Sequence, residues 1–266
     1  MPTQTTDFIK LVNVNKSFTI GDTSVHVLKN INIEIKKGDF AIIFGPSGCG
    51  KSTLLHTILG LEHPSSGQVL IEGEDFYSKD QDERAMYRRH KVGMIYQQPL
   101  WISSLDVYNN LVFSLHLLNY NREILEEKAK SVLEIVGMSE KMYYRPTELS
   151  SGQQQKVSLA RALIIDPALI VADEPTGNLD TVSGQELINT FLRINEKGIT
   201  IIMVTHDLEY LKYASHIFHI IDGVVVEDLH PKNRFKGQIK GKRGVIEENK
   251  DTADVRDPKF LQKLGI

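Results

Sequence analysis

The sequence has few of the features that mark secreted, membrane-spanning or nucleic-acid-binding proteins. It contains a single cysteine, Cys49, so no disulfide can form within the chain and a reducing compartment is expected. No segment approaches the roughly 18 to 20 apolar residues of a membrane span, and the N-terminus lacks the basic and apolar regions of a leader. The formal net charge is -3, so no basic excess indicates a polyanion. We therefore predict a cytoplasmic protein without a nucleic-acid partner, and any role at a membrane must come through another protein.

The 266 residues are 41% hydrophobic, which is enough for one large core. Near-continuous apolar runs predict parallel strands covered on both faces by helices, at 40–44, 168–173 and 199–204. Mixed apolar and polar runs predict half-buried antiparallel strands, at 8–14, 31–35 and 67–73. Amphipathic periodicity predicts helices between them, at 51–60, 153–164 and 181–197. The alternation indicates a layered α/β fold.

Two further segments stand apart from this alternation. From Asp106 to about Lys141 helical periodicity continues without a strand signal, which predicts a helical lobe inserted into the α/β core. After Asp222-Gly223, a predicted hairpin turn, the pattern weakens beyond about residue 229. The last part of the chain is first basic and then acidic. It is interpreted as a solvated tail, with contact to a membrane surface or a partner as the alternative.

The stretch "GPSGCGKS", residues 45–52, fits the pattern G-x-x-x-x-G-K-[ST] between an apolar strand and a helix. In that context backbone amides and the helix dipole point at phosphate oxygens, Lys51 reaches the β- and γ-phosphates, and the Ser52 hydroxyl ligates Mg²⁺. Cys49 lies within this loop, either as a small space-filling residue or as a thiol whose pKa the helix N-terminus lowers. The predicted nucleotide-binding residues of this loop are Gly45, Pro46, Ser47, Gly48, Cys49, Gly50, Lys51, Ser52 and Thr53.

Polar residues follow the other predicted strands at the edge where ligands collect in open α/β sheets. We assign Asp173 to Mg²⁺ and Glu174 to the catalytic base that orients the attacking water. His206 follows the next apolar strand and is predicted to lie opposite the γ-phosphate. Gln97 ends the strand "VGMIY" and is predicted to reach the metal or the water.

A second glycine-containing helix start, "LSSGQQQK", covers residues 149–156. Ser150 is a good N-cap residue, and Gly152 permits close backbone approach, so this terminus also offers amides to an anion. The chain already has one loop, residues 45–52, that is predicted to bind a triphosphate. We therefore predict that Ser150, Ser151, Gly152 and Gln153 close over the nucleotide of a second copy, so that two chains enclose two triphosphates.

Five motifs follow one another along the chain: "GPSGCGKS", the glutamine of "YQQ", "LSSGQQQK", "VADEPTGNLD" and "VTHD". In this order they resemble ATP-binding-cassette ATPases, the motor subunits of ABC transporters, and the resemblance covers about residues 7–227. The resemblance implies ATP and Mg²⁺, a second copy and a separate transmembrane permease as partners, and a place on the cytoplasmic face of the membrane. It also implies that Phe18 stacks on adenine, that Asp180 senses the partner copy, and that Gln97 couples the site to the permease. The implied fold is a P-loop NTPase (RecA-like) core with an N-terminal antiparallel β subdomain and a helical subdomain. The corresponding boundaries are 1–228 for the ATPase domain, about 98–155 for the helical subdomain and 229–266 for a C-terminal extension.

"DEPTGNLD" and "SGQQQ" are most similar to the subgroup that serves lipoprotein release, macrolide and peptide export, and cell division. Ser151 stands where the family's signature has its second glycine, and Lys156 stands where the subgroup commonly has an arginine. The added Cβ of Ser151 is expected to weaken or slow closure of the two copies over the nucleotide. Trp101 is expected either on the permease-docking surface or in the core of the helical lobe. A regulator of the cell-division type, which signals without moving a substrate, stays an alternative. A soluble mechanical ATPase is disfavoured because the chain has neither two cassettes nor a long coiled coil.

Overall fold

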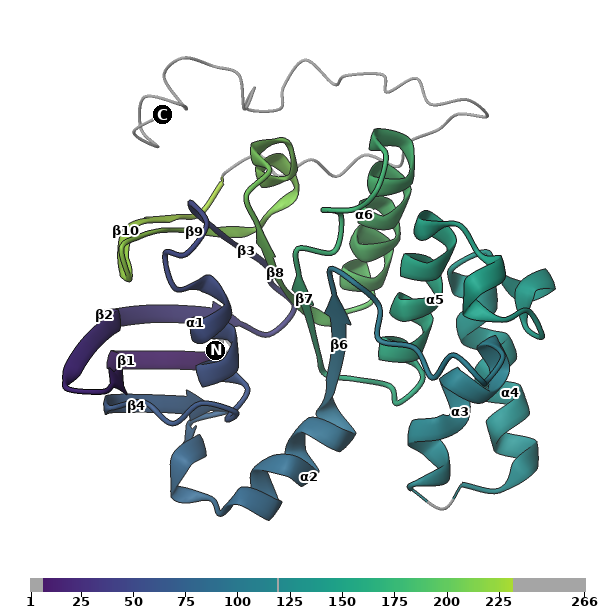
Figure 1. Ribbon diagram of the computed structural model, residues 1–266, viewed down its shortest axis with the longest axis horizontal. Helices are drawn as coiled ribbons and strands as arrows, with labels where there is room; N and C mark the ends of the chain where they lie inside the picture. Colours follow the sequence, from purple (N-terminus) through teal and green to yellow (C-terminus); the bar gives the residue numbers. More distant parts are fainter. Residues whose placement is uncertain (1–6, 119, 232–266) are drawn as a thin grey trace, which may run out of the picture. The chain divides into compact units, whose positions relative to one another are not determined.

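The computed structural model describes residues 7–118 and 120–231, which form two compact units (Figure 1). Unit one combines the chain up to Ala85 with the chain from Thr200 onward. Unit two spans Met86–Ile199. The predicted tail from Lys232 to the end lies outside the described residues.

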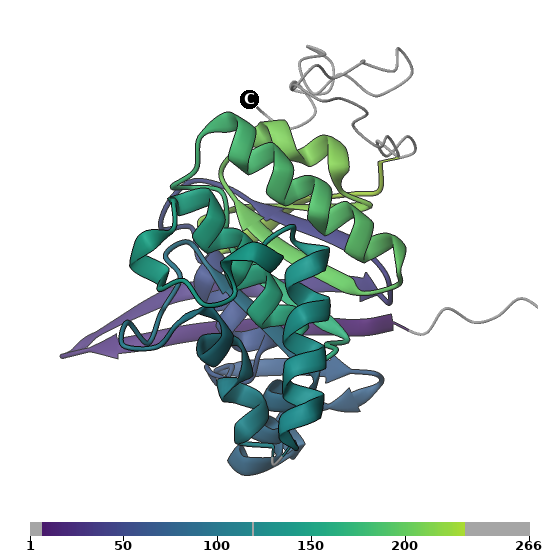
Figure 2. The ribbon, with the colours of Figure 1, turned by 90° about the vertical axis from the view of Figure 1, so that its right-hand side faces the viewer.

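Unit one contains an antiparallel sheet with the strand order β2-β1-β4-β5. Its strands are β1 (Asp7–Ile20), β2 (Thr23–Lys36), β4 (Ser66–Ile71) and β5 (Glu74–Asp75). The three predicted half-buried strands are confirmed as antiparallel partners, and β1 and β2 continue further than predicted into a long hairpin, purple in Figure 2. Buried and exposed residues alternate through much of β2, as a sheet with one covered face requires.

The second group of strands in unit one carries the loop of interest. Its members are β3 (Phe40–Phe44), β8 (Thr200–Thr205), β9 (His216–Ile221) and β10 (Val224–Leu229), and helix α1 (Lys51–Ile58) follows β3. Their order is β10-β9-β3-β8, with β3 parallel to both β8 and β9. Every residue of β3 and β8 is buried, which explains their continuous apolar sequences. The hairpin turn at Asp222-Gly223 is confirmed, with φ of 47° and 79°.

Unit two pairs β6 (Val92–Tyr96) with β7 (Leu169–Asp173) in parallel. Its helices are α3 (Val107–His116), α4 (Arg122–Ile135), α5 (Ser151–Leu163) and α6 (Thr181–Glu196). α2 (Gln81–Lys91) precedes β6, and unit two has the short 3₁₀ turns η2 (Ser139–Lys141) and η3 (Pro146–Glu148). Two further 3₁₀ turns, η1 (Phe76–Ser78) and η4 (Leu208–Tyr213), belong to unit one. The predicted helices at 153–164 and 181–197 and the helical lobe are therefore confirmed, with end shifts of a few residues.

Side chains at the helix starts explain where these helices begin. Asp106, Asn121 and Asp180 each accept a hydrogen bond from a backbone amide in the first turn of α3, α4 and α6 respectively. α6 is followed by Gly198 with φ of 93°, the left-handed conformation that ends a helix. α3, α4 and α5 contact one another and form the teal group of Figure 2. Within the described ranges, none of the helices combines the length and apolar character needed to cross a bilayer.

Candidate functional site

The loop between β3 and α1 has a backbone that only glycine allows at two positions. Gly45 has φ of 155°, and a Cβ there would overlap the carbonyl oxygen of Ile220 on β9. Gly50 is the N-cap residue of α1 with φ of 105°, and a Cβ there would lie 3.0 Å from the carbonyl oxygen of Val27. The loop is therefore pressed against two neighbouring strands, while the side chains at its tip, Pro46 and Ser47, stay exposed.

Lys51, the first residue of α1, places a buried positive charge inside this loop. It is 6% exposed, and its Nζ donates to the carbonyl oxygens of Gly45 and Pro46, each at 2.8 Å. The first turn of α1 contains no acidic residue, and Lys51 forms no ion pair with any described carboxylate. A buried ammonium without a carboxylate partner at a helix N-terminus strongly favours a bound anion. Ser52 is exposed beside it, and Thr53 is half-buried.

Cys49 is a packing residue. It is 4% exposed, and its Sγ lies 4.0 Å from the Nζ of Lys51. Burial raises the pKa of its thiol, and the nearby charge of Lys51 offsets this only in part. The idea that the helix N-terminus lowers this pKa is therefore wrong in direction, because desolvation of the thiolate outweighs the favourable charge. The alternative, a small space-filling residue, is what the structure shows.

His206 lies at the same edge of unit one as the loop. Phe44 and Thr205 are register partners at the ends of the parallel strands β3 and β8, so Gly45 and His206 are the next residues of adjacent strands. The His206 side chain is exposed, and the Thr205 hydroxyl oxygen accepts from the amide of Asp207 and turns the chain after it. His206, the predicted neighbour of the γ-phosphate, therefore directly follows β8, and β8 pairs with the strand that precedes the β3–α1 loop.

Phe18 is half-buried on β1, opposite Val25 of β2. The ammonium of Lys16 lies 4.6 Å from the centre of the Phe18 ring, which is a cation–π distance. One face of the ring is thus covered by a cation. Stacking of the ring on adenine stays a prediction.

Unit two brings three of the predicted metal and base residues, Gln97, Asp173 and Glu174, to one strand edge. Tyr96 of β6 and Asp173 of β7 are register partners, so Gln97 and Glu174 follow on adjacent strands. Glu174 has φ of 45°, a left-handed conformation that is strained for a residue with a side chain and is found most often at functional sites. A Cβ on Gly177 would lie 2.7 Å from Nε2 of Gln97, so this glycine permits the position of the Gln97 side chain.

Gln155 fixes this edge, and sequence reasoning missed it. Its side chain is 2% exposed, and Nε2 donates to the carbonyl oxygens of Tyr96 at 2.9 Å, Gln97 at 3.2 Å and Pro175 at 2.9 Å. One amide of α5 thereby joins the ends of β6 and β7. The sequence offered one indication of this role: Gln155 lies at a core-facing position of an otherwise amphipathic helix, and a buried side-chain amide needs hydrogen-bond partners.

The second predicted anion site is the N-terminus of α5. Ser150 and Gln153 form a reciprocal cap: the Ser150 hydroxyl oxygen accepts from the Gln153 amide at 3.3 Å, and Gln153 Oε1 accepts from the Ser150 amide at 3.0 Å. The amides of Ser151 and Gly152 have no hydrogen-bond partner among the described residues. Ser151 is exposed, whereas a Cβ on Gly152 would lie 2.7 Å from Oγ of Ser183. Gly152 therefore also serves close packing against α6, which the sequence prediction did not include.

The start of α6 stands directly beside that terminus. Asp180 accepts from the Ser183 amide at 3.0 Å and from the Ser183 hydroxyl at 2.7 Å. These hydrogen bonds hold the pKa of Asp180 below its ordinary value. Further along the same pair of helices, Lys156 forms an ion pair with Glu186 at 2.6 Å. Asp180 and the α5 terminus therefore form one connected surface of unit two.

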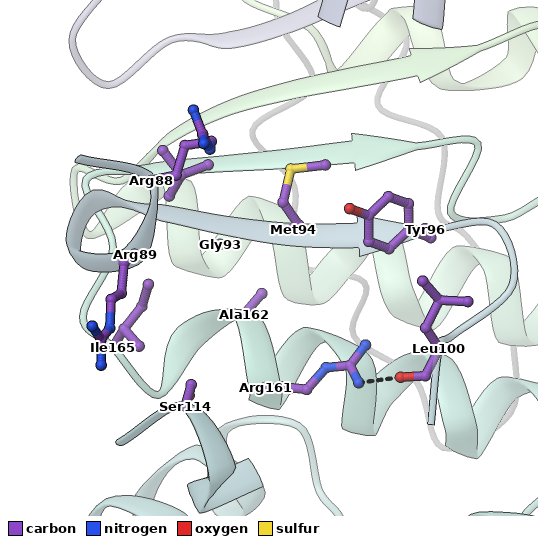
Figure 3. A pocket seen from close by; sticks show the side chains of 11 residues that line it. Arg88, Arg89, Gly93, Met94, Tyr96, Leu100, Ser114, Arg161, Ala162 and Ile165 are labelled. Carbon is purple, nitrogen blue, oxygen red and sulfur yellow. Dashed lines mark hydrogen bonds between the residues drawn. The ribbon is translucent and has the colours of Figure 1, made fainter. Parts of the chain in front are cut away.

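Unit two also contains a cavity of about 380 Å³ between β6 and helices of the unit (Figure 3). Three arginines line it together with apolar and small residues, and they are Arg88, Arg89 and Arg161. Arg161 donates to the carbonyl oxygen of Leu100, and burial lowers its pKa. Nε of Arg89 is buried without a hydrogen-bond partner among the described residues. Sequence reasoning missed this basic cavity because its residues come from separate segments.

Trp101 lies beside this cavity and is half-buried. The guanidinium of Arg161 stands 4.6 Å from the centre of the indole ring, and the indole Nε1 donates to Gln154 Oε1 at 3.0 Å. Trp101 is therefore neither a fully buried core residue nor a free surface residue.

The chain is similar to known proteins in sequence and in fold. A family model described as "ABC transporter" matches residues 28–177. An uncharacterized ABC transporter ATP-binding protein of Methanocaldococcus jannaschii is 44% identical, over 82% of this chain and 98% of that protein. The macrolide export ATP-binding/permease protein MacB of Bdellovibrio bacteriovorus is 40% identical over 83% of this chain but only 34% of its own length. The dimeric ATP-binding cassette MJ0796, solved in a post-hydrolysis state with ADP and Pi, matches with a TM-score of 0.77 and 35% identity over 84% of this chain and 98% of that one.

Proposed function

Because this chain belongs to the ABC transporter family, we propose that it is the ATP-binding and ATP-hydrolysing subunit of an ABC exporter. Two copies enclose two Mg-ATP and drive a separate transmembrane permease, which holds the protein at the cytoplasmic face of the membrane. Relatives that the chain covers almost end to end are named ATP-binding proteins, while the MacB relatives are named for an ATP-binding part and a permease part and for macrolide export. We extend that export class to this chain.

The buried charge of Lys51 is the observation that carries the proposal. Its ammonium lies within a glycine-dependent loop at the N-terminus of α1, where it contacts two carbonyl oxygens and the Cys49 sulfur but no described carboxylate. A triphosphate supplies the missing negative charge, and backbone amides of the loop bind its oxygens. If Lys51 had only a structural role, a buried cation without an anionic partner would not be needed at this position.

The donor set also fits Mg²⁺, which prefers oxygen ligands. Unit one offers the Ser52 hydroxyl as a candidate ligand, unit two offers the Asp173 carboxylate and the Gln97 amide oxygen, and the ion would neutralise charge on the β- and γ-phosphates. Glu174, with its strained backbone, orients and deprotonates the attacking water, and His206 contacts the γ-phosphate from the strand beside the loop. These roles stay part of the proposal.

Closure requires a second copy. The α5 terminus offers the amides of Ser151 and Gly152, and its cap orients them without occupying them. We propose that they bind the γ-phosphate held by the partner copy, while Asp180 contacts the partner. Loss of the γ-phosphate by hydrolysis removes the shared ligand, so the dimer opens.

The Glu174→Gln variant tests this proposal. A general base contributes about 10²- to 10⁴-fold, so hydrolysis should fall by at least about 100-fold while ATP binding persists. The variant should then accumulate as a dimer in saturating Mg-ATP, measured by size-exclusion chromatography with light scattering. Glu72→Gln is a matched control, because Glu72 also has positive φ but lies in the turn between β4 and β5. A Glu174→Gln protein that stays monomeric at every concentration, or that hydrolyses ATP normally, would refute the proposal.

We further propose that the arginine-lined cavity of unit two receives the permease. A buried, unpartnered Arg89 Nε and a desolvated Arg161 call for a partner segment that carries an acidic group among apolar residues. The Arg89→Glu variant should keep basal ATP hydrolysis and lose the membrane protein that copurifies with the wild type. Arg122→Glu, at the exposed start of α4, is the control. Equal recovery of the membrane protein with both variants would place the docking surface elsewhere.

A further inference from the structure

A cluster of two histidines and one aspartate lies at one end of the β9–β10 hairpin. His216 begins β9, Asp228 lies near the end of β10, and His230 follows the last residue of that strand. The antiparallel register pairs Leu229 with Ile217 and so brings the two ends together. All three side chains belong to unit one, and none of them belongs to the proposed ATP site.

The three side chains point their ligand atoms at one place. His216 Nε2 lies 2.5 Å from Asp228 Oδ1, and His230 Nε2 lies 4.0 Å from the same oxygen. One ligand atom from each residue lies within 4.8 Å of the other two. Tetrahedral ligands at bonds of about 2.0–2.2 Å are separated by about 3.3 Å, so shifts of about 1 Å in the exposed side chains would suffice.

The surroundings fix one ligand and leave the others accessible. His216 is 2% exposed, and its ring contacts the rings of Phe218 and His230, with ring centres 4.0 and 3.8 Å away respectively. His230 is 62% exposed in its side chain, and Asp228 is also exposed, so an ion can enter from solvent.

A carboxylate stands behind the buried histidine. His216 Nδ1 is buried without a hydrogen-bond partner among the described residues, and the nearest carboxylate oxygen is Asp39 Oδ2 at 4.0 Å. Asp39 is itself held by the Lys36 amide at 2.9 Å and the Ser215 hydroxyl at 2.9 Å. Metal-binding histidines commonly direct their second ring N–H at such a carboxylate, which fixes the ring and raises its basicity. The orphaned Nδ1 facing Asp39 is therefore a second, independent feature of a metal site.

We propose that His216, Asp228 and His230 bind a divalent transition-metal ion, with Zn²⁺ as the ion that the donor set fits best. Two imidazole nitrogens and one carboxylate oxygen suit Zn²⁺ rather than Mg²⁺ or Ca²⁺, which prefer oxygen donors. Water completes the coordination on the exposed side. The ion would close the open end of the β9–β10 hairpin, far along the hairpin from the Asp222-Gly223 turn. The site is thus distinct from the Mg²⁺ site of ATP hydrolysis.

Zinc binding by the full chain tests this proposal. The protein is purified without a histidine tag, stripped with a chelator and titrated with ZnSO₄ in the absence of nucleotide, by calorimetry and by thermal unfolding. We expect one ion per chain at this site and a higher Tm with bound metal, because only the folded state presents all three ligands. Co²⁺ as a spectroscopic probe should give the intense absorption of a four-coordinate site.

Two ligand variants and one control separate this site from other histidines. His230→Gln and Asp228→Asn should each weaken Zn²⁺ binding by more than about tenfold, as the loss of a ligand requires. His90→Gln, an exposed histidine on α2, should bind like the wild type. Because His230 is exposed, His230→Gln should keep the metal-free Tm, which guards against loss of binding through misfolding. A wild type without zinc binding, or a His230→Gln variant with wild-type stoichiometry and affinity, would overturn the proposal and leave a simple His216–Asp228 hydrogen bond.

Discussion

The Gln155→Met variant removes a buried hydrogen-bond donor while keeping the shape of the side chain. In the wild type, Nε2 of Gln155 donates to the carbonyl oxygens of Tyr96, Gln97 and Pro175. An acceptor left unsatisfied in the interior costs about 1–3 kcal/mol, and of these three hydrogen bonds the one to Pro175 is buried while those to Tyr96 and Gln97 are part-buried. Gln155 Oε1 is buried without a partner among the described residues, so its removal offsets about one such penalty. We therefore expect a net loss of about 2 kcal/mol in the free energy of unfolding.

The consequence for catalysis follows from what the three carbonyls position. The carbonyls belong to Gln97 itself and to Tyr96 and Pro175, the neighbours of Gln97 and Glu174, which are the predicted metal and base residues. Loss of the hydrogen bonds to these carbonyls should therefore lower kcat for ATP hydrolysis by at least about tenfold. KM should change less, because the phosphate loop belongs to unit one and is untouched. The assays are chemical unfolding and steady-state phosphate release.

Gln154→Met is the matched control on the same helix. Gln154 bonds to Leu149 and Trp101 rather than to the strand ends, so its loss should cost about 1 kcal/mol and leave kcat near the wild-type value. If Gln155→Met is as stable and as active as Gln154→Met, the idea that Gln155 fixes the catalytic strand edge is wrong.

Two further predictions concern the phosphate loop. Gly45→Ala should abolish ATP binding and lower Tm, because its Cβ would overlap the Ile220 carbonyl oxygen. The control Gly38→Ala has φ of 81° but open space around it, so it should lose only a little stability. Fluorescent-nucleotide binding and thermal unfolding measure both effects, and normal ATP binding by Gly45→Ala would contradict the packing argument. The rate at which N-ethylmaleimide alkylates Cys49, followed by mass spectrometry, should be low at about pH 7 and should still increase with pH above about pH 9. The reason is that the raised pKa keeps the thiol protonated through the range where an ordinary cysteine ionises. A rate that levels off below about pH 8 would contradict this direction of the pKa shift.

Comparison of particular elements shows where sequence reasoning succeeded. The apolar runs at 40–44 and 199–204 predicted buried parallel strands, and β3 and β8 are buried at every residue. The Ser150 cap and the Asp222-Gly223 turn were also predicted and confirmed. Each of these features depends on residues within a few positions of one another, so periodicity and local hydrogen bonding are sufficient to predict it.

Other features depend on residues that meet only after folding. The direction of the Cys49 pKa shift was wrong because the sequence shows the helix start but not the burial of the thiol. Gln155 and Tyr96 are 59 residues apart, and nothing near either residue indicates their hydrogen bond. The arginine cavity likewise gathers residues from α2, the segment after β6, and α5.

The sequence by itself determined the glycine-rich turn before α1, most of the strands and helices along the chain and the family, because these are written in short patterns of residue type and spacing. The tertiary structure alone decided which side chains are desolvated and which distant groups face one another. Lys51 became a buried cation, and His216 came to meet Asp228 and His230 across a hairpin. Charge and coordination chemistry depend on distance and on exclusion of water, and only the packed chain sets both.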